Sequence, residues 1–140
     1  MKIYKANRKG GFKYILIGSI IFPIIFFLVD KNKYIEQPLL ILLLLIPMLL
    51  LTWIYFGTYY KIENGKLFYQ SAFLRGYIEI SSIQEIQIGK TLWMGIKPAL
   101  ARNGLIIKSS KINIIYIAPE NNQELIADLL KSNPQIKISE

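Results

Sequence analysis

The sequence lacks cysteine and histidine altogether, and its acidic residues are few. The chain therefore has no thiol nucleophile, no imidazole base, no disulfide and no Cys/His zinc site. Nine Asp and Glu stand against seventeen Lys and Arg, which gives a formal net charge of +8. A basic balance suits anionic lipid or nucleic acid, although membrane proteins are often basic for reasons of topology alone.

The carboxylates that remain form no pattern of an active site. Acid/base catalysis needs two of them in one cleft, but Glu63, Glu79 and Glu85 fall at outward strand positions or strand ends, and the later acids follow one predicted helix. The glycines are scattered at turns and make no phosphate-binding loop. We therefore predict a protein that is not an enzyme, with no catalytic residue, no metal site and no cofactor.

Two long uncharged runs lie near the amino end, at residues 14–29 and 37–60. At about 1.5 Å per residue the second run crosses a hydrocarbon core of about 30 Å, whereas the first, at about 24 Å, needs Phe12 and Lys13 to span it. A cleavable signal peptide is disfavoured, because the first run ends in Phe-Phe-Leu-Val-Asp rather than in small residues. We predict a transmembrane hairpin with spans at about 12–30 and 38–60.

The cations flanking these runs predict the orientation. Five Lys and Arg and no acid precede the first run, while the connector at 30–36 balances two Lys with two acids. The amino end is then expected in the cytoplasm, and two crossings return the chain to the same side. We expect a multi-pass protein of the inner (cytoplasmic) membrane with both termini cytoplasmic. Aromatic residues at the two mouths are expected to act as interface anchors: Tyr34, Trp53, Tyr55, Tyr59 and Tyr60.

Beyond residue 60 the pattern changes to short segments rich in Ile, Tyr and Phe. Asn64-Gly65 predicts a hairpin between strands at 59–63 and 66–72. Alternating residues predict four more strands, at 75–80, 84–88, 104–109 and 112–117.

A helix is expected after these strands, with Pro119 in its first turn and a stop at 131–134. Leu125, Ile126, Leu129 and Leu130 would form its apolar face. The sequence thus predicts an α+β protein: a membrane hairpin (1–60) followed by a cytoplasmic domain (61–140), a small antiparallel β-barrel or sheet capped by a carboxy-terminal amphipathic helix.

Several short motifs in this second part resemble the bacterial PH-domain family found in small two-span membrane proteins. The resemblance covers 59–138 and includes Tyr60-Lys-Ile-Glu-Asn-Gly-Lys-Leu67, Ile80-Ser-Ser-Ile-Gln-Glu-Ile86, Ala101-Arg-Asn-Gly-Leu-Ile-Ile107 and Ile117-Ala-Pro-Glu120. It implies a PH-like fold but no activity that could be assigned to named residues. Ala118 replaces the Ser that commonly precedes the helix proline, and only six strands are predicted where a PH barrel has seven.

The connection from Lys90 to Asn103 is the candidate contact segment, because it is long, partly apolar and without an acid. In one interpretation Leu92, Trp93 and Ile96 cover the side of the barrel and the cations are solvated. In the other, the segment contacts anionic lipid headgroups or a protein partner. The candidate contact residues are Lys90, Trp93, Met94, Lys97 and Arg102.

Two further ligand classes are disfavoured. A two-residue turn at Asn64-Gly65 leaves no room for the basic cradle with which PH domains hold phosphoinositides. From Lys61 onward ten Lys and Arg against seven Asp and Glu leave only +3, so nucleic acid is not expected. We predict a membrane-anchored PH-like binding or scaffolding module of unknown ligand; the alternative is an immunity-type or structural membrane protein whose activity lies in the hairpin.

Overall fold

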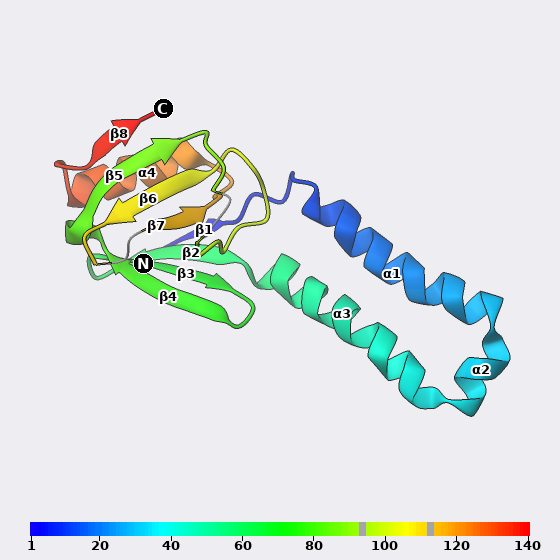
Figure 1. Cartoon of the computed structure of the whole chain (residues 1–140). Helices are drawn as coiled ribbons and strands as arrows, with labels where there is room; N and C mark the ends of the chain where they lie inside the picture. The colour runs from blue at the N-terminus through cyan, green and yellow to red at the C-terminus, as the bar shows by residue number, and fades with distance from the viewer. Residues whose placement is uncertain (93–94, 112–113) are drawn as a thin grey trace.

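The computed structural model describes residues 1–92, 95–111 and 114–140. A small domain of two sheets and one helix stands at one end of a long helical hairpin (Figure 1). The elements follow in the order β1 (Lys2–Lys5), α1 (Phe12–Val29), α2 (Lys31–Glu36), α3 (Pro38–Gly57), β2 (Tyr59–Glu63), β3 (Lys66–Ser71), β4 (Leu74–Glu79), a 3₁₀ turn η1 (Ile80–Ser82), β5 (Ile83–Ile88), β6 (Leu105–Ser109), β7 (Ile114–Ile117), α4 (Asn122–Ser132) and β8 (Lys137–Ser139).

The hairpin consists of α1 and α3, which are apolar on every side. Both helices are long and apolar enough to cross a membrane. Leu16 is the only buried residue of α1, and α3 has none. The connector contains the short helix α2, which begins where the Asp30 carboxylate accepts a hydrogen bond from the Lys33 amide. The helix α3 ends at Gly57, three residues before the expected end of the span, because β2 starts at Tyr59.

The first sheet has the strand order β1-β2-β3-β4, all antiparallel. Its central hairpin turns at Asn64 and Gly65, which have φ angles of 49° and 70°. Positive φ at both positions is what a two-residue type I′ turn requires, and Asn-Gly is its preferred sequence. The prediction of a hairpin at this dipeptide is confirmed.

Strand β1 was not expected, since sequence reasoning treated its lysines only as cations flanking a span. Lys5 pairs with Tyr59 and Tyr4 with Tyr60, so β1 and β2 are neighbours in the sheet. The whole hairpin from α1 to α3 is therefore inserted between two adjacent strands. Residues 2–5 and 59–60, which the sequence assigned to the membrane part, belong to the PH-like sheet.

The second sheet has the order β7-β6-β5-β8. Its first three strands are antiparallel as predicted, whereas β8 runs parallel to β5 at the other edge. The additional strands of the domain thus come from the two ends of the chain. In its described residues, the connection 90–103 contributes one isolated bridge, between Ile96 and Ile115.

The helix α4 closes the domain, and its apolar residues Leu125, Ile126 and Leu129 are buried as predicted. The helix begins at Asn122 rather than at Pro119. Asn121 is the cap, because its side chain accepts a hydrogen bond from the Glu124 amide at 3.1 Å.

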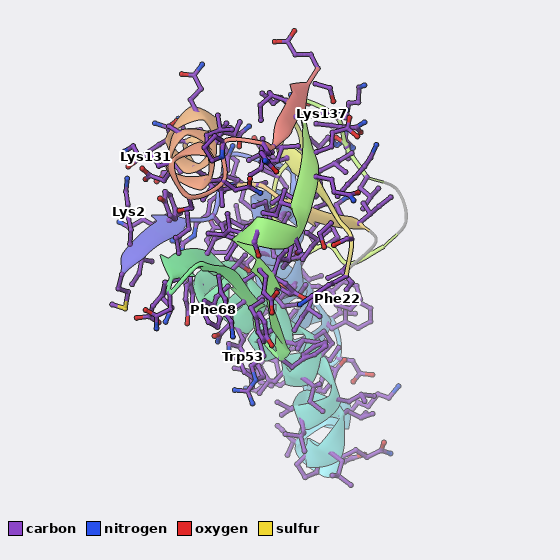
Figure 2. The ribbon with its side chains drawn as sticks, turned by 90° about the vertical axis from the view of Figure 1, so that its left-hand side faces the viewer. Lys2, Phe22, Trp53, Phe68, Lys131 and Lys137 are labelled. Atoms are coloured by element: carbon purple, nitrogen blue, oxygen red, sulfur yellow. The ribbon has the colours of Figure 1, made fainter. Side chains whose placement is uncertain are left out.

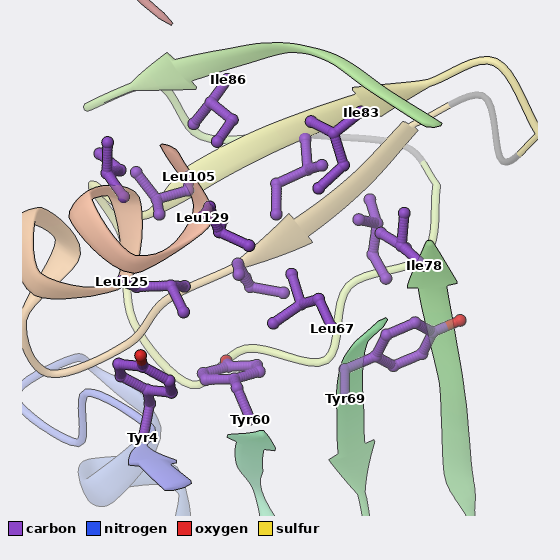
Figure 3. Close-up of a cluster of buried hydrophobic side chains, with 14 of the residues drawn as sticks. Tyr4, Tyr60, Leu67, Tyr69, Ile78, Ile83, Ile86, Leu105, Leu125 and Leu129 are labelled. Atoms are coloured by element: carbon purple, nitrogen blue, oxygen red, sulfur yellow. The ribbon is translucent and has the colours of Figure 1, made fainter. Parts of the chain in front are cut away.

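The core lies between the two sheets and α4, and side chains from all three meet there (Figure 3). Tyr4 and Ala6 contribute to it from the amino-terminal segment. Tyr60, expected at a membrane interface, is fully buried in this core instead. Strand alternation explains the difference, because Tyr60 points inward from β2 whereas Tyr59 points outward.

Polar contacts fix β1 to α4. The Lys2 ammonium forms ion pairs with Glu124 at 2.8 Å and with Asp128, and the Tyr4 hydroxyl donates to the Asp128 carboxylate at 2.6 Å. Figure 2 shows Lys2 next to the helix that carries Lys131. These bonds hold the pKa of the Asp128 carboxyl well below its usual range. The amino-terminal strand β1 and the late helix α4 therefore pack together in one domain.

Candidate functional site

The described residues of the connection 90–103 lie on the side of the domain from which α1 departs (Figure 1). Its second half is bound to the domain: Leu100 is part of the core, and the buried Tyr60 hydroxyl donates to the Pro98 carbonyl at 2.6 Å. Gly10, in the segment entering α1, approaches the same stretch so closely that a Cβ atom there would lie 2.6 Å from the Leu100 carbonyl oxygen. The connection and the start of the hairpin are therefore in direct contact.

A second buried tyrosine fixes the end of the connection. The Tyr116 hydroxyl donates to the Ala101 carbonyl and accepts from the Gly104 amide, each at 2.9 Å. Leu92 is partly buried against the small cluster around Tyr116, while Ile96 remains 37% exposed. Leu92 therefore packs against the side of the domain, as the first interpretation of this segment expected, whereas Ile96 does so only in part.

Three of the five predicted contact residues lie within the part of this connection that the structure describes. Lys90, Lys97 and Arg102 are exposed. Within the described residues, no hydrogen bond, ion pair or ring contact joins these three side chains to one another, and Lys97 lies over the Tyr116 ring at 5.2 Å. Trp93 and Met94 lie outside the described residues.

The end of α3 is tied to the sheet by polar contacts. The Thr58 hydroxyl donates to the Ile54 carbonyl at 2.6 Å and lies 2.8 Å from the Ser71 hydroxyl, at the end of β3. Both side chains are buried. The turn that follows β3 is thereby held beside the last turn of α3.

Arg8 makes a further connection to this end of α3. Its guanidinium donates to the Phe56 carbonyl at 3.4 Å and lies 5.2 and 5.4 Å from the ring centres of Tyr55 and Phe56. A cation at the carboxyl end of a helix is favourable because the last carbonyls carry partial negative charge. Arg8 therefore fixes the domain to the hairpin at the level where the hairpin begins.

Sequence reasoning missed an exposed face of the first sheet that combines aromatic and basic side chains. A shallow groove of about 330 Å³ lies on this face. Phe68 and Tyr77 are ring neighbours at 5.7 Å, the Lys61 ammonium lies 5.0 Å from the Phe68 ring, and the Lys66 ammonium lies 4.3 Å from the Tyr77 ring. We call this the aromatic–basic face; its members are Tyr59, Lys61, Lys66, Phe68, Arg75 and Tyr77.

The signal for this face was present in the sequence. Strand residues alternate between the two sides of a sheet, so the chain neighbours of the inward-facing Leu67, Tyr69 and Ile78 have to face outward. The register then brings the outward residues of three strands together.

The acids of the two sheets are held in ion pairs rather than in a cleft. Glu63 pairs with Lys61 at 2.7 Å, and Glu79 pairs with Lys111 at 2.6 Å. These bonds lower the pKa of both carboxyls. In the part of the chain that the structure describes, no group of three acidic side chains could hold a metal ion.

Comparison with known proteins identifies the domain. The family profile of the bacterial PH domain matches residues 58–133, more than half of the chain. No curated protein and no solved structure matches the sequence significantly. The matched region contains β2 to β7 and α4, which make up the closing helix and both sheets apart from the edge strands β1 and β8. The chain therefore belongs to the bacterial PH-domain family.

Proposed function

We propose that this protein is a membrane-anchored binding module in which α1 and α3 span the bilayer and hold the PH-like domain at the cytoplasmic surface. One observation carries the proposal: each buried residue of the core cluster lies outside the hairpin, whose helices expose apolar side chains on nearly every side. The hairpin reaches this core only at the domain end, through the partly buried Phe12, Ile54 and Tyr55. Exposed apolar helices of 18 and 20 residues are unstable in water but match the thickness of a hydrocarbon core.

The distribution of side chains along the hairpin supports the same arrangement. At the domain end, Trp53 and Phe56 are exposed on the last turns of α3, as interface anchors are. Arg8, Lys9 and Lys13 lie at this end as well, whereas the connector carries equal numbers of Lys and acid. By the positive-inside rule, the domain end faces the cytoplasm.

We further propose that the module binds rather than catalyses. The PH-domain family is generally a non-catalytic binding family, and the acids of the described sheets are ion-paired. The connection 90–103, which the sequence analysis predicts as the contact segment, is the proposed binding site. This connection contacts the segment entering α1 at Leu100 and Ala101, and its exposed cations would face anionic headgroups or a protein partner.

Extraction of membranes from expressing cells tests the anchor. The full chain is expected to stay with the membrane at alkaline pH, which releases peripheral proteins. The control is a chain in which a short turn replaces residues 7–58; Lys5 and Tyr59 are register partners, so a tight turn can join the two strands. This control should be recovered in the soluble fraction. Release of the full chain by the alkaline wash would contradict the proposal.

A second experiment tests the connection. Trp93→Ala and reversal of Lys90, Lys97 and Arg102 are compared in the soluble chain that has a short turn in place of residues 7–58, because the hairpin would hold the full chain in any vesicle. Lower thermal stability after Trp93→Ala would indicate core packing. Loss of salt-sensitive binding to anionic vesicles would indicate lipid, and loss of a co-purifying protein with vesicle binding intact would indicate a partner.

A further inference from the structure

The turn between β3 and β4 presents an aromatic side chain to the outside. Ser71 pairs with Leu74, so Ala72 and Phe73 form a two-residue loop. Ala72 is buried and has a φ of 50°, a conformation that L residues adopt rarely. Phe73 is 72% exposed, more than Tyr77 at 46% or Tyr59 at 36%. An aromatic ring this exposed at a tight turn contributes nothing to the core.

The turn lies beside the end of α3, on the side of the domain from which the hairpin extends (Figure 1). The Thr58 hydroxyl is 2.8 Å from that of Ser71, and a Cβ atom on Gly57 would lie 3.7 Å from the Ala72 amide nitrogen. Trp53 and Phe56 are exposed on the last turns of the same helix (Figure 2 labels Trp53). Phe73 therefore extends the aromatic residues at the end of α3 onto the domain.

Charge along the outer side of the sheet changes with distance from the hairpin. The row nearest to it, read across four paired strands, is Lys5, Tyr59, Gln70 and Arg75. The row at the opposite end of β2, β3 and β4 is Glu63, Lys66 and Glu79.

The near row thus contains two cations and no acid, whereas the far row contains two acids and one cation. Within the described residues, neither Lys5 nor Arg75 has an acidic side chain within ion-pair distance. This end of the sheet is complementary to a negatively charged surface lying across the end of α3.

We infer that the β3–β4 turn is a second membrane contact, in which Phe73 enters the headgroup region of the anionic leaflet around the hairpin while Arg75 and Lys5 face lipid phosphates. The inference rests on the proposed function, because only a membrane-spanning hairpin brings that leaflet to the turn. It differs from the phosphoinositide mode of PH domains, since the short turn at Asn64 and Gly65 lies at the far end of the same strands. The contact would fix the tilt of the domain on the bilayer.

Single-cysteine labelling tests the inference, because the natural sequence has no cysteine. Phe73→Cys carries an environment-sensitive fluorophore in the full chain, reconstituted into nanodiscs of phosphatidylglycerol and phosphatidylcholine with nitroxide-labelled lipid. Lys66→Cys, in the far row at the start of β3, the strand that leads into the turn, is the matched control. Leu43→Cys, within α3, reports on the hairpin itself. We expect quenching several-fold stronger at position 73 than at position 66, and a loss of this difference with Arg75→Glu or in phosphatidylcholine alone.

Three results would overturn the inference. Equal, weak quenching at positions 73 and 66, with strong quenching at 43, removes the second contact and leaves the anchor intact. Quenching at 73 that ignores both Arg75→Glu and lipid charge removes the anionic leaflet as its ligand. A photo-crosslinker at 73 that captures a protein rather than lipid in native membranes assigns the turn to a partner. Absence of quenching at 43 would instead overturn the proposed function.

Discussion

Truncation of the Tyr4 side chain tests whether the amino-terminal strand β1 contributes to the stability of the PH-like domain. Tyr4 is 5% exposed and packs in the core between β2 and α4, with its hydroxyl bonded to Asp128. Removing a buried aromatic side chain costs about 3–5 kcal/mol of the free energy of unfolding. A small domain has roughly 5–15 kcal/mol in total. Tyr4→Ala should therefore remove a large part of the stability.

The neighbouring residue provides a matched control. Ile3 lies on the same strand but points outward and is 55% exposed, so Ile3→Ala should change stability by no more than about 0.5 kcal/mol. Urea titration of the detergent-solubilised full chain, followed by near-ultraviolet circular dichroism, measures both variants. With a slope of about 1.5 kcal/mol per molar urea, Tyr4→Ala should lower the midpoint by roughly 2–3 M. Equal midpoints for the two variants would refute the place of β1 in the core.

Three further outcomes follow from the same structure. Leu129→Asp, which buries an unpaired charge under α4, should cost several kcal/mol, whereas Lys131→Asp on the exposed side should cost little; equal thermal stability of both would show that α4 does not pack there. Hydrogen bonds from Ser139, Lys108 and Gln87 lower the pKa of Glu85 to about 2, so the contribution of this carboxylate to stability is present above about pH 4.5 and is lost as the pH falls toward 2. Glu85→Gln should therefore make the unfolding midpoint depend less on pH over this range. The same pH dependence in the variant and the natural chain would contradict the contact. A chain with a short turn in place of residues 7–58 should fold as a soluble domain, whereas residues 59–140 alone should not, and cooperative unfolding of the latter would show that β1 is dispensable.

The local features of the fold could be predicted because each has a local cause. The dipeptide Asn64-Gly65 fixes a turn by backbone conformation, and the alternation in 66–71 fixes which side chains point inward. The two apolar helices were evident from length and composition alone. These signals need no knowledge of what lies elsewhere in the chain.

The parts that were missed depend on contacts between distant residues. Strand β1 has four residues and is separated from its partner β2 by the whole hairpin, so nothing nearby in the sequence marks it as a strand. Strand β8 is three residues long and becomes a strand only by pairing with β5. The start of α4 was placed three residues early because Pro119 suits a first helical turn, but Ala118 and Glu120 are bonded to the amino-terminal segment instead.

The candidate site likewise combines features that could be predicted from the sequence with features that depend on strand pairing. The exposure of Lys90, Lys97 and Arg102 agrees with a solvated or contacting role, and their roles stay predictions. The aromatic–basic face needed the register of three strands, because Tyr59, Phe68 and Tyr77 lie on β2, β3 and β4 and come together only when these strands pair.

The membrane topology of the hairpin tests the central claim most directly. Asn32→Cys places a thiol in the connector and Glu140→Cys places one at the end of the domain, in a sequence that otherwise has none. Each variant is treated with a membrane-impermeant maleimide in spheroplasts before and after permeabilisation. An anchored cytoplasmic domain predicts that position 32 is labelled in intact spheroplasts and position 140 only after permeabilisation. Labelling of position 140 in intact spheroplasts, with position 32 protected, would contradict it.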